Sequence, residues 1–215
     1  MTSPYHSIGQ SIPRVGAPEK VTGTARFSAD IELDRPLLLK ALRSDRPHAE
    51  IAAIDGRKAL ALEGVAAVFT AKDIPGKNLT GIIVKDQPVL AEGRVRCVGE
   101  AVALVAAETE AAADRALKAV EVAYRDLPAV LDAEKAMAAD APRVHAKGNV
   151  MTTRTIRRGD AEAAFARCRS VIEKTYRTTF VEHNYIEPDA GAGFVDGDGT
   201  LVIYASTQNP HYDHK

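Results

Sequence analysis

The last strand-like run of the sequence delivers side chains that could contact a bound ligand. The run LVIYASTQNPHYDHK spans residues 201–215, and its first part is apolar and suited to a sheet. Ser206, Thr207, Gln208 and Asn209 follow before a proline. The side-chain amide of Gln208 is a neutral hydrogen-bond donor, so it can hold an anionic group without titrating. A strand end is also rigid enough to aim that amide at a ligand.

Other polar residues are explained better by local structure than by chemistry. His211 and His214 are three residues apart, a spacing that could hold a metal on a helix, but isolated loop histidines are more often solvated. Asp196 and Asp198 lie in a DGDG turn, and the turn accounts for them without acid–base catalysis. The sequence therefore predicts no metal site and no catalytic carboxylate pair in this chain.

The stretch EHNYIEPDAG, residues 182–191, leaves two readings open. Three polar side chains precede a possible strand, and Pro188 after Glu187 indicates a sheet edge or a bulge because proline lacks a backbone donor. The polar residues could be caps on a structural edge. They could equally belong to an edge that faces a pocket.

Composition narrows the class of protein. The 215 residues are 46% hydrophobic, enough for a core, and carry a net charge of -1, which gives no reason to expect nucleic acid. The longest apolar runs are too short to span a bilayer, and the N-terminus has no secretory pattern. Cys97 and Cys168 are far apart, which indicates a reducing compartment. We therefore predict a cytoplasmic protein that binds neither nucleic acid nor membrane.

Residues up to about 130 alternate between strand and helix patterns, which predicts an α/β or α+β domain. Asp55 can cap the first helix, Gly64 ends it, and the many alanines favour close helix–sheet packing. The predicted helices cover residues 55–62 and 108–120, and the predicted strands cover residues 37–43, 49–54, 65–70, 95–98, 101–106 and 121–124.

The pattern changes after a linking segment over residues 132–150, whose first part, residues 132–139, predicts a short helix. Strands are then predicted over residues 170–180, 185–194 and 201–206, with a hairpin turn at residues 196–199. So few strands rarely bury enough apolar surface alone. We expect this second, sheet-rich part to pack on the first domain or to be completed by another polypeptide.

Several phrases of the sequence, in order, resemble the xanthine dehydrogenase and aldehyde oxidoreductase family. Each phrase is weak alone, but together they resemble the start of the family's molybdenum-binding large subunit, from about Gly9 to the last residue. The phrases are VTGTARFSADI (21–31), HAEIAAID (48–55), GVAAVFTAKDIPG (64–76), VRCVGEAVALVAAETEAAADRALKAVEVAY (95–124), HNYIEPDAG (183–191) and STQNP (206–210).

The resemblance implies an α+β fold in two parts. Residues 1–135 would form an N-terminal arm and an α/β-hammerhead domain, and residues 140–215 would begin a molybdopterin-binding domain. It also implies a reaction, the hydroxylation of an N-heterocycle or an aldehyde with oxygen from water. The cofactor would be molybdenum-molybdopterin in the cytosine dinucleotide form usual in bacterial relatives. Fe–S clusters and FAD would lie on partner subunits of a hetero-oligomer, which would act on a small-molecule substrate.

One residue inherits a role from the resemblance. Gln208 matches the glutamine of the family's STQ-type turn, whose amide donates to an axial oxygen on molybdenum. The family's general-base glutamate and its glycine-rich segment would lie beyond residue 215, so the resemblance assigns no catalytic residue here. It implies a truncated, split or proteolysed large subunit that needs its remaining segments for activity.

Two other readings compete with this one. The chain could be a non-catalytic hammerhead module that docks an Fe–S or flavin partner subunit. It could also be an unrelated α/β domain whose phrases match by chance. Turnover that depends on Gln208 within the assembled complex distinguishes the first reading from the docking module.

Overall fold

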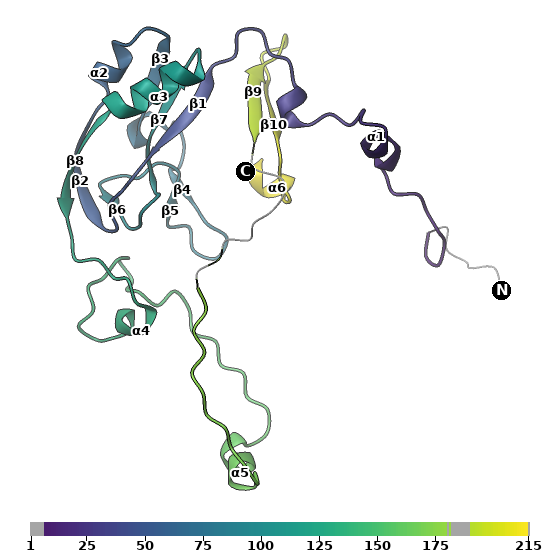
Figure 1. Cartoon of the computed structure of the whole chain (residues 1–215), viewed down its shortest axis with the longest axis vertical. Helices are drawn as coiled ribbons and strands as arrows, with labels where there is room; N and C mark the ends of the chain where they lie inside the picture. The colour runs from purple at the N-terminus through teal and green to yellow at the C-terminus, as the bar shows by residue number, and fades with distance from the viewer. Residues whose placement is uncertain (1–6, 180, 182–189, 215) are drawn as a thin grey trace. The chain divides into compact units, whose positions relative to one another are not determined.

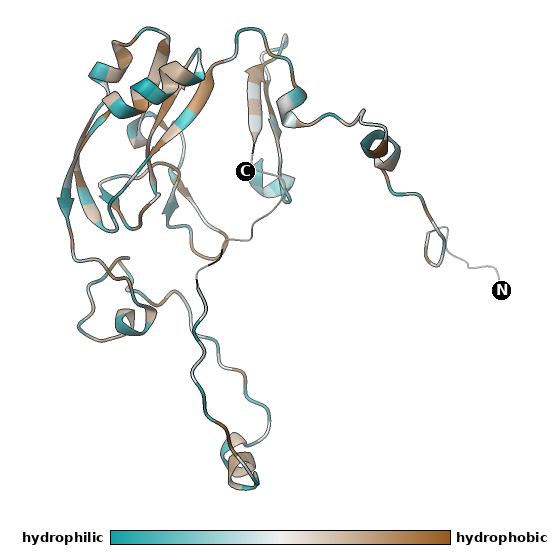
Figure 2. Cartoon of the chain, viewed as in Figure 1, coloured by the Kyte–Doolittle hydropathy of each residue, from teal (hydrophilic) through white to brown (hydrophobic). Residues whose placement is uncertain are grey.

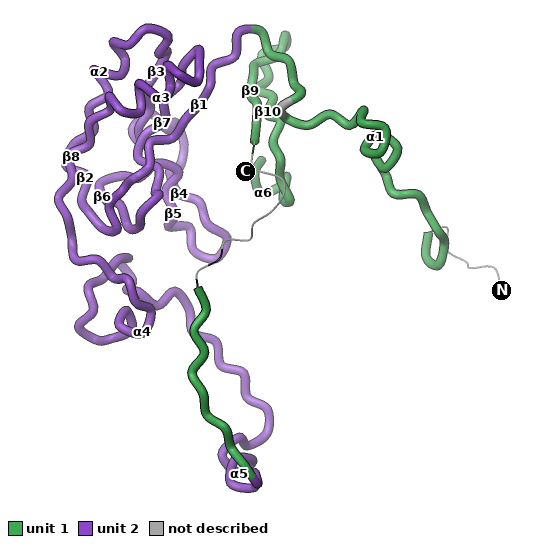
Figure 3. Tube along the Cα trace, in the orientation of Figure 1, with its two compact units in different colours: residues 1–34, 170–215 green, residues 35–169 purple. Residues whose placement is uncertain are grey.

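The structure is a computed structural model of the chain and describes residues 7–179, 181 and 190–214. Its contacts divide the chain into two compact units, unit 1 (residues 1–34 and 170–215) and unit 2 (residues 35–169), drawn in separate colours in Figure 3. These units are defined by contacts within the chain, and such contacts do not determine where one domain ends and the next begins. The boundary expected near residue 140 therefore stays a prediction.

Unit 2 is built on two antiparallel sheets of three strands (Figure 1). The first has the order β1-β7-β3 and the second β6-β2-β8, while β4 and β5 form a small hairpin beside them. The strands are β1 (Leu38–Arg43), β2 (Ala49–Asp55), β3 (Val65–Phe69), β4 (Leu79–Thr80), β5 (Gln87–Pro88), β6 (Arg94–Val95), β7 (Ala101–Ala107) and β8 (Glu121–Asp126).

The longest described helix, α3 (Glu110–Ala119), packs on the first sheet beside α2 (Arg57–Leu60). It begins where the Thr109 hydroxyl accepts the Ala112 N–H at 3.1 Å, which satisfies a backbone donor that the first turn leaves unpaired. The helix buries Ala112, Ala113 and Ala116, whose small side chains let it approach the strands closely. This confirms the expected role of alanine.

β7 lies at the centre of the core of unit 2. Its Val102 packs in one buried cluster with Ala49 and Val95, and its Val105 packs in a second cluster with Ala59. All of these side chains are fully buried. The colouring of Figure 2 shows hydrophobic segments on the strands and hydrophilic ones on α3. The two clusters therefore depend on the same strand.

Most predicted elements of unit 2 are confirmed, although some are shorter than predicted and the strands β2, β7 and β8 are longer. The helix predicted over residues 55–62 is reduced to α2, and the strand predicted over residues 95–98 is reduced to β6. Asp55 accepts the Arg57 N–H at 3.0 Å as expected, although Gly56 occupies the N-cap position. The remaining short elements of the unit are η2 (Ala71–Asp73), α4 (Ala133–Ala136) and α5 (Ala161–Ala166).

Unit 1 combines an N-terminal arm with a hairpin. Its elements are α1 (Ala17–Val21), η1 (Ser28–Asp30), β9 (Gly191–Val195), β10 (Leu201–Ala205) and α6 (Pro210–Asp213). The short turns of the arm agree with its many prolines and glycines, and η1 packs against β9. The mixed helices and strands of both units confirm the α+β class.

One predicted strand is wrong, and the short helices α1, α5 and α6 were not predicted. Residues 170–179 form no strand in the described chain, because a strand needs a neighbour to complete its hydrogen bonds and no described segment pairs there. The strand predicted over residues 185–194 is seen as β9, while its residues 185–189 lie outside the described chain. Of these three helices, α5 is capped by Asp160, whose carboxylate accepts the Ala163 N–H at 3.0 Å. No described helix is long and apolar enough to cross a membrane.

Candidate functional site

The hairpin of β9 and β10 carries the segment that ends at Gln208. Its turn is held by Asp196, whose Oδ1 accepts the N–H groups of Asp198 at 3.0 Å and Thr200 at 2.9 Å. This confirms that the turn accounts for Asp196. Beyond the strand, the Ser206 N–H donates to the Ala190 carbonyl at 3.0 Å, so the paired geometry continues toward Gln208.

Apolar side chains lie on both faces of the hairpin. Phe194 and Tyr204 stack on one face with ring centroids 6.0 Å apart. Val195, Leu201 and Ile203 lie on the opposite face, and each is 65% exposed. A hairpin with apolar residues on both faces is typical of a larger buried sheet.

Gln208 lies in a bend between the end of β10 and the start of α6. The Thr207 hydroxyl accepts the Asn209 N–H at 3.0 Å, and the Asn209 carbonyl accepts the Tyr212 N–H at 2.9 Å. Pro210 opens the helix, where its missing N–H costs nothing. Backbone contacts therefore hold the chain on both sides of Gln208, whose side chain is exposed and able to meet a ligand.

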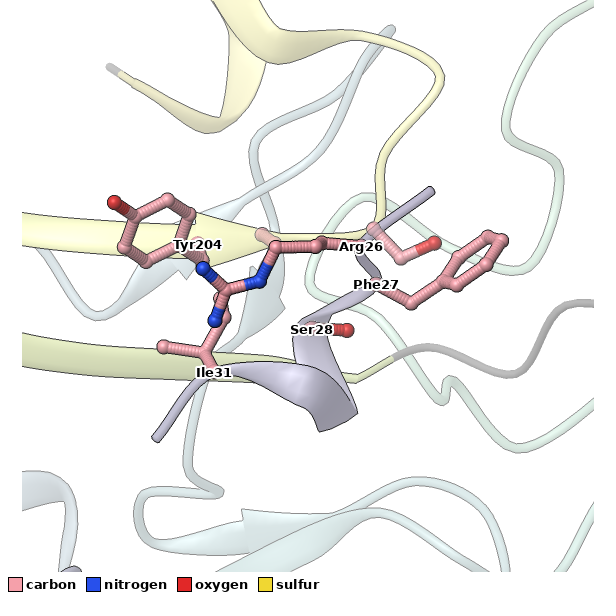
Figure 4. A pocket seen from close by; sticks show the side chains of 7 residues that line it. Arg26, Phe27, Ser28, Ile31 and Tyr204 are labelled. Atoms are coloured by element: carbon pink, nitrogen blue, oxygen red, sulfur yellow. The ribbon is translucent and has the colours of Figure 1, made fainter. Parts of the chain in front are cut away.

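A pocket of about 390 Å³ lies beside this segment within unit 1 (Figure 4). One wall comes from the end of β10 and the other from the arm around η1. The lining residues are Arg26, Phe27, Ser28, Ile31, Tyr204, Ala205 and Ser206. The sequence did not predict this pocket, although Arg26 lies in the first phrase that carries the family resemblance.

Internal hydrogen bonds hold the arm's wall of the pocket. The Arg26 Nη2 donates to the Asp30 carbonyl at 2.8 Å, and the Asp30 carboxylate accepts the Phe27 N–H at 2.8 Å. Figure 4 shows the Arg26 side chain extending across the pocket toward Tyr204 and Ile31. A cation, hydroxyl groups and aromatic rings therefore line one space.

A second cavity, of about 610 Å³, lies in unit 2. Charges inside it are largely balanced, since His145 lies 3.3 Å from Asp86 and Arg96 lies 4.0 Å from Glu100. Burial, and then the nearby Glu100 carboxylate, raise the pKa of the Cys97 thiol in the same cavity. A protonated thiol is a poor nucleophile, so the cavity offers no evident catalytic group.

The remaining predicted residues do not assemble into a site. His211 lies in α6 and His214 follows it, and the described residues contain no group of three His, Cys, Asp or Glu side chains able to hold a metal. Residues 182–189 of the EHNYIEPDAG stretch, including Glu187, lie outside the described chain.

Comparison with protein families matches most of the chain. Residues 22–128 match the aldehyde oxidase and xanthine dehydrogenase a/b hammerhead domain, and residues 144–215 match the molybdopterin cofactor-binding domain. The chain belongs to the xanthine dehydrogenase and aldehyde oxidoreductase family. Its hammerhead domain and the start of its molybdopterin-binding domain are those that the sequence resemblance predicted.

Relatives in this family are longer. The nicotinate dehydrogenase large molybdopterin subunit of Eubacterium barkeri is 42% identical over 99% of this chain and 50% of its own length. A probable xanthine dehydrogenase subunit of Bacillus subtilis (strain 168) is 42% identical over 90% of this chain and 26% of its own length. The chain thus spans half the length of the first relative and about a quarter of the length of the second.

Solved structures of the family share the fold. Aldehyde oxidoreductase from Desulfovibrio gigas matches with a TM-score of 0.77 and 33% identity, covering 89% of this chain and 23% of that one. Quinoline 2-oxidoreductase from Pseudomonas putida 86 matches with a TM-score of 0.78 and 30% identity, covering 93% of this chain and 27% of that one.

Proposed function

We propose that the chain forms part of the large, molybdopterin-binding subunit of a molybdenum hydroxylase. The reaction would hydroxylate a carbon of an N-heterocycle or an aldehyde with oxygen from water. The match of residues 144–215 to the cofactor-binding domain supports this proposal, as do the names of the relatives. Because the chain spans only part of those relatives, the activity is proposed for the whole subunit.

The observation that carries the proposal is the setting of Gln208. Its exposed side-chain amide lies between the end of β10 and the start of α6, where the Asn209 carbonyl already accepts the Tyr212 N–H. The whole segment lies within the residues that match the cofactor-binding domain. In this setting the amide would donate a hydrogen bond to an oxygen of the bound molybdenum cofactor. A neutral donor keeps that contact at any working pH.

The residues present fit such a cofactor at one edge. The exposed Gln208 amide and the Ser206 hydroxyl that lines the pocket would face a ligand rich in hydrogen-bond acceptors. When bound, the molybdenum cofactor supplies the two-electron oxidation. The contribution of this chain is to orient the cofactor through the Gln208 side chain.

The proposal extends to the form of the pterin, to the partner subunits and to the location of the complex. The pterin would carry a cytosine nucleotide, and electrons would leave through Fe–S clusters and FAD on partner subunits of a hetero-oligomer. The substrate would be a small molecule, and the complex would work in the cytoplasm. The relatives that are named as subunits support a multi-subunit assembly.

The test is a glutamine substitution in the complex purified from its host. Gln208→Ala should lower kcat by about 10- to 100-fold, because loss of an outer contact to a metal site typically costs that much. Molybdenum content and subunit composition should stay unchanged. Gln10→Ala, a change of an exposed glutamine on the arm, is the matched control and should leave turnover intact.

Two outcomes would contradict the assignment. Unchanged kinetics in a molybdenum-loaded Gln208→Ala complex would remove the role of Gln208. A complex that fails to assemble, or that carries no molybdenum in the unmodified protein, would favour the docking module instead.

A further inference from the structure

We propose that residues 150–169 form a docking segment that binds an acidic surface of another polypeptide. Its arginines would pair with carboxylates of that surface, and its apolar side chains would be buried between them. This contact requires neither the proposed reaction nor Gln208.

The docking segment lies within unit 2 and is almost fully exposed. Between Met137 and Asp160 the described chain forms no helix or strand, and α5 that follows is a short helix. Every residue from 150 to 169 is exposed except Ala163, which is half-buried. Connections of this length without secondary structure are uncommon in compact domains, and they usually serve binding or linkage. The side chains of the segment are therefore accessible to a partner.

The docking segment differs in charge from the rest of the chain. It contains five arginines and two carboxylates, a net charge of +3, whereas the whole chain has a net charge of -1, so the other residues sum to -4. One of the two carboxylates, Asp160, is occupied in capping α5. The arginines are exposed and form no ion pair with another described residue: Arg154, Arg157, Arg158, Arg167 and Arg169. Their charge is available to carboxylates outside the chain.

Large apolar side chains lie between these arginines in the sequence. Ile156 is 95% exposed, Met151 is 65% exposed and Phe165 is 60% exposed. Since folding buries little of their surface, burial of these side chains in a complex would favour binding. Arginine, methionine and aromatic residues are also the types that protein interfaces contain more often than other surfaces do.

Two other kinds of anionic partner fit the segment less well. A segment that lies on a membrane is typically a long amphipathic helix, but residues 150–160 form no helix and α5 has six residues. A nucleic acid would be repelled by the net charge of -4 on the rest of the chain. The segment has no lysine, and the guanidinium fork of arginine matches the two oxygens of a carboxylate. An acidic protein surface is therefore the partner that the segment fits best.

The first experiment is an NMR titration of the ¹⁵N-labelled 215-residue chain with defined probes. The probes are an acidic peptide that alternates Glu-Leu and Asp-Phe pairs, its neutral counterpart with Gln and Asn at the acidic positions, single-stranded oligothymidine, and phosphatidylserine vesicles. The acidic peptide should cause saturable shifts of the Ile156 and Phe165 amide signals, and the neutral peptide should not. Tighter binding of the oligonucleotide or of the vesicles would assign the segment to that partner and overturn the proposal.

Matched variants assign the binding to the docking segment. Arg157→Gln with Arg158→Gln should weaken binding of the acidic peptide about three- to tenfold, the range expected for two exposed ion pairs. Ile156→Ser leaves the charge unchanged and should weaken binding by about tenfold, because it removes apolar surface. Arg115→Gln with Lys118→Gln removes two charges from exposed sites of α3 and should bind like the unmodified chain. The amide spectrum of each variant verifies its fold.

A second experiment tests the contact in the complex purified from its host. Arg157→Lys with Arg158→Lys keeps the charge and supplies amines, which a carbodiimide joins directly to carboxylates in contact with them. Mass spectrometry should find these lysines joined to an Asp or Glu of another polypeptide. Arg115→Lys, at an exposed site of α3, is the matched control and should give no such product.

Three results would overturn the proposal. The first is equal affinity for the acidic and the neutral peptide. The second is an equal loss of binding in the α3 control, which would indicate general ionic association. The third is a set of cross-links that stay within the chain. None of these results bears on the turnover of Gln208→Ala, so failure here and failure of the proposed function are distinguishable.

Discussion

The side-chain amide of Asn78 bonds both backbone groups of Leu90. Asn78 Nδ2 donates to the Leu90 carbonyl at 2.8 Å, and Asn78 Oδ1 accepts the Leu90 N–H at 3.0 Å. Leu90 is 6% exposed, so water cannot readily replace these bonds. This single side chain therefore closes the base of the hairpin formed by β4 and β5.

Replacement of Asn78 should destabilise unit 2. Asn78→Ala leaves two buried backbone groups without partners, and we expect it to lower the free energy of unfolding by about 2 kcal/mol. Asn78→Asp loses the donor to the Leu90 carbonyl, so its free energy of unfolding should be no higher than that of Asn78→Ala. Urea unfolding measures both, with Lys77→Ala, an exposed neighbour, as control. A loss below about 0.5 kcal/mol, the range of ordinary surface changes, would contradict this account.

Gly81 should resist any side chain. Its φ is +137°, and a Cβ atom there would lie 1.9 Å from the Val84 carbonyl oxygen. Gly81→Ala must therefore shift the loop, at a cost of about 1–3 kcal/mol. Gly76→Ala is the matched control, because a Cβ atom at Gly76 meets nothing within 4 Å. Equal Tm values for the two variants would show that the loop adapts freely.

Asp55 should make stability depend on acid pH. Hydrogen bonds from the Arg57 guanidinium, and then from the Arg57 N–H, lower the pKa of Asp55 below its usual range. A lowered pKa stabilises the fold above the unfolded value of about 3.9, and this contribution disappears as the pH falls through the folded pKa. Asp55→Asn should thus lower the urea midpoint at pH 7, and the difference from the unmodified chain should shrink below about pH 4. Glu63→Gln, at an exposed carboxyl, should show no such trend.

Lys40 should stabilise the contact between β1 and α3 in a salt-dependent way. Its Nζ lies 2.6 Å from the Asp114 carboxylate and 2.9 Å from the Glu110 carboxylate, and these hydrogen bonds raise the pKa of Lys40. The contribution is complete below the unfolded pKa of about 10.4 and is lost as the pH rises through the folded value. Lys40→Met should lower the Tm by a few degrees at most, because both carboxylate partners are exposed.

The salt dependence of the Tm decrease in Lys40→Met tests whether the ion pairs cause it. The Tm difference should narrow in about 1 M NaCl, where the screening length is about 3 Å. Lys85→Met, at an exposed lysine of the β4–β5 loop, should change little in either salt. A difference that is the same at low and high salt would point to side-chain packing.

The elements of unit 2 could be predicted because their signals are local. Helix α3 follows from its alanines and from Thr109, and in unit 1 the hairpin turn follows from Asp196 and its glycines. The strand expected over residues 170–180 could not be judged this way, since a strand exists only with a neighbour to complete its hydrogen bonds. Its apolar pattern carries no information about that neighbour.

The candidate site was predicted only in part. Gln208 could be named because a family phrase surrounds it, and its role remains a proposal. The pocket beside it brings Arg26 together with Tyr204, which are far apart in the sequence, and no spacing rule connects them. Contacts between distant segments follow from the folded arrangement of the arm and the hairpin, which single-residue patterns do not encode.

The position of β7 limits how this domain can diverge. Val102 and Val105 serve different clusters, and Leu42 and Val122 pack against both. A change of volume on this strand must be compensated on two sides at once, so neutral drift there should be slow. The loop between β4 and β5, where Ile82 is 87% exposed, carries no such constraint. Substitutions at Ile82 should therefore be tolerated more readily than changes of side-chain volume on β7.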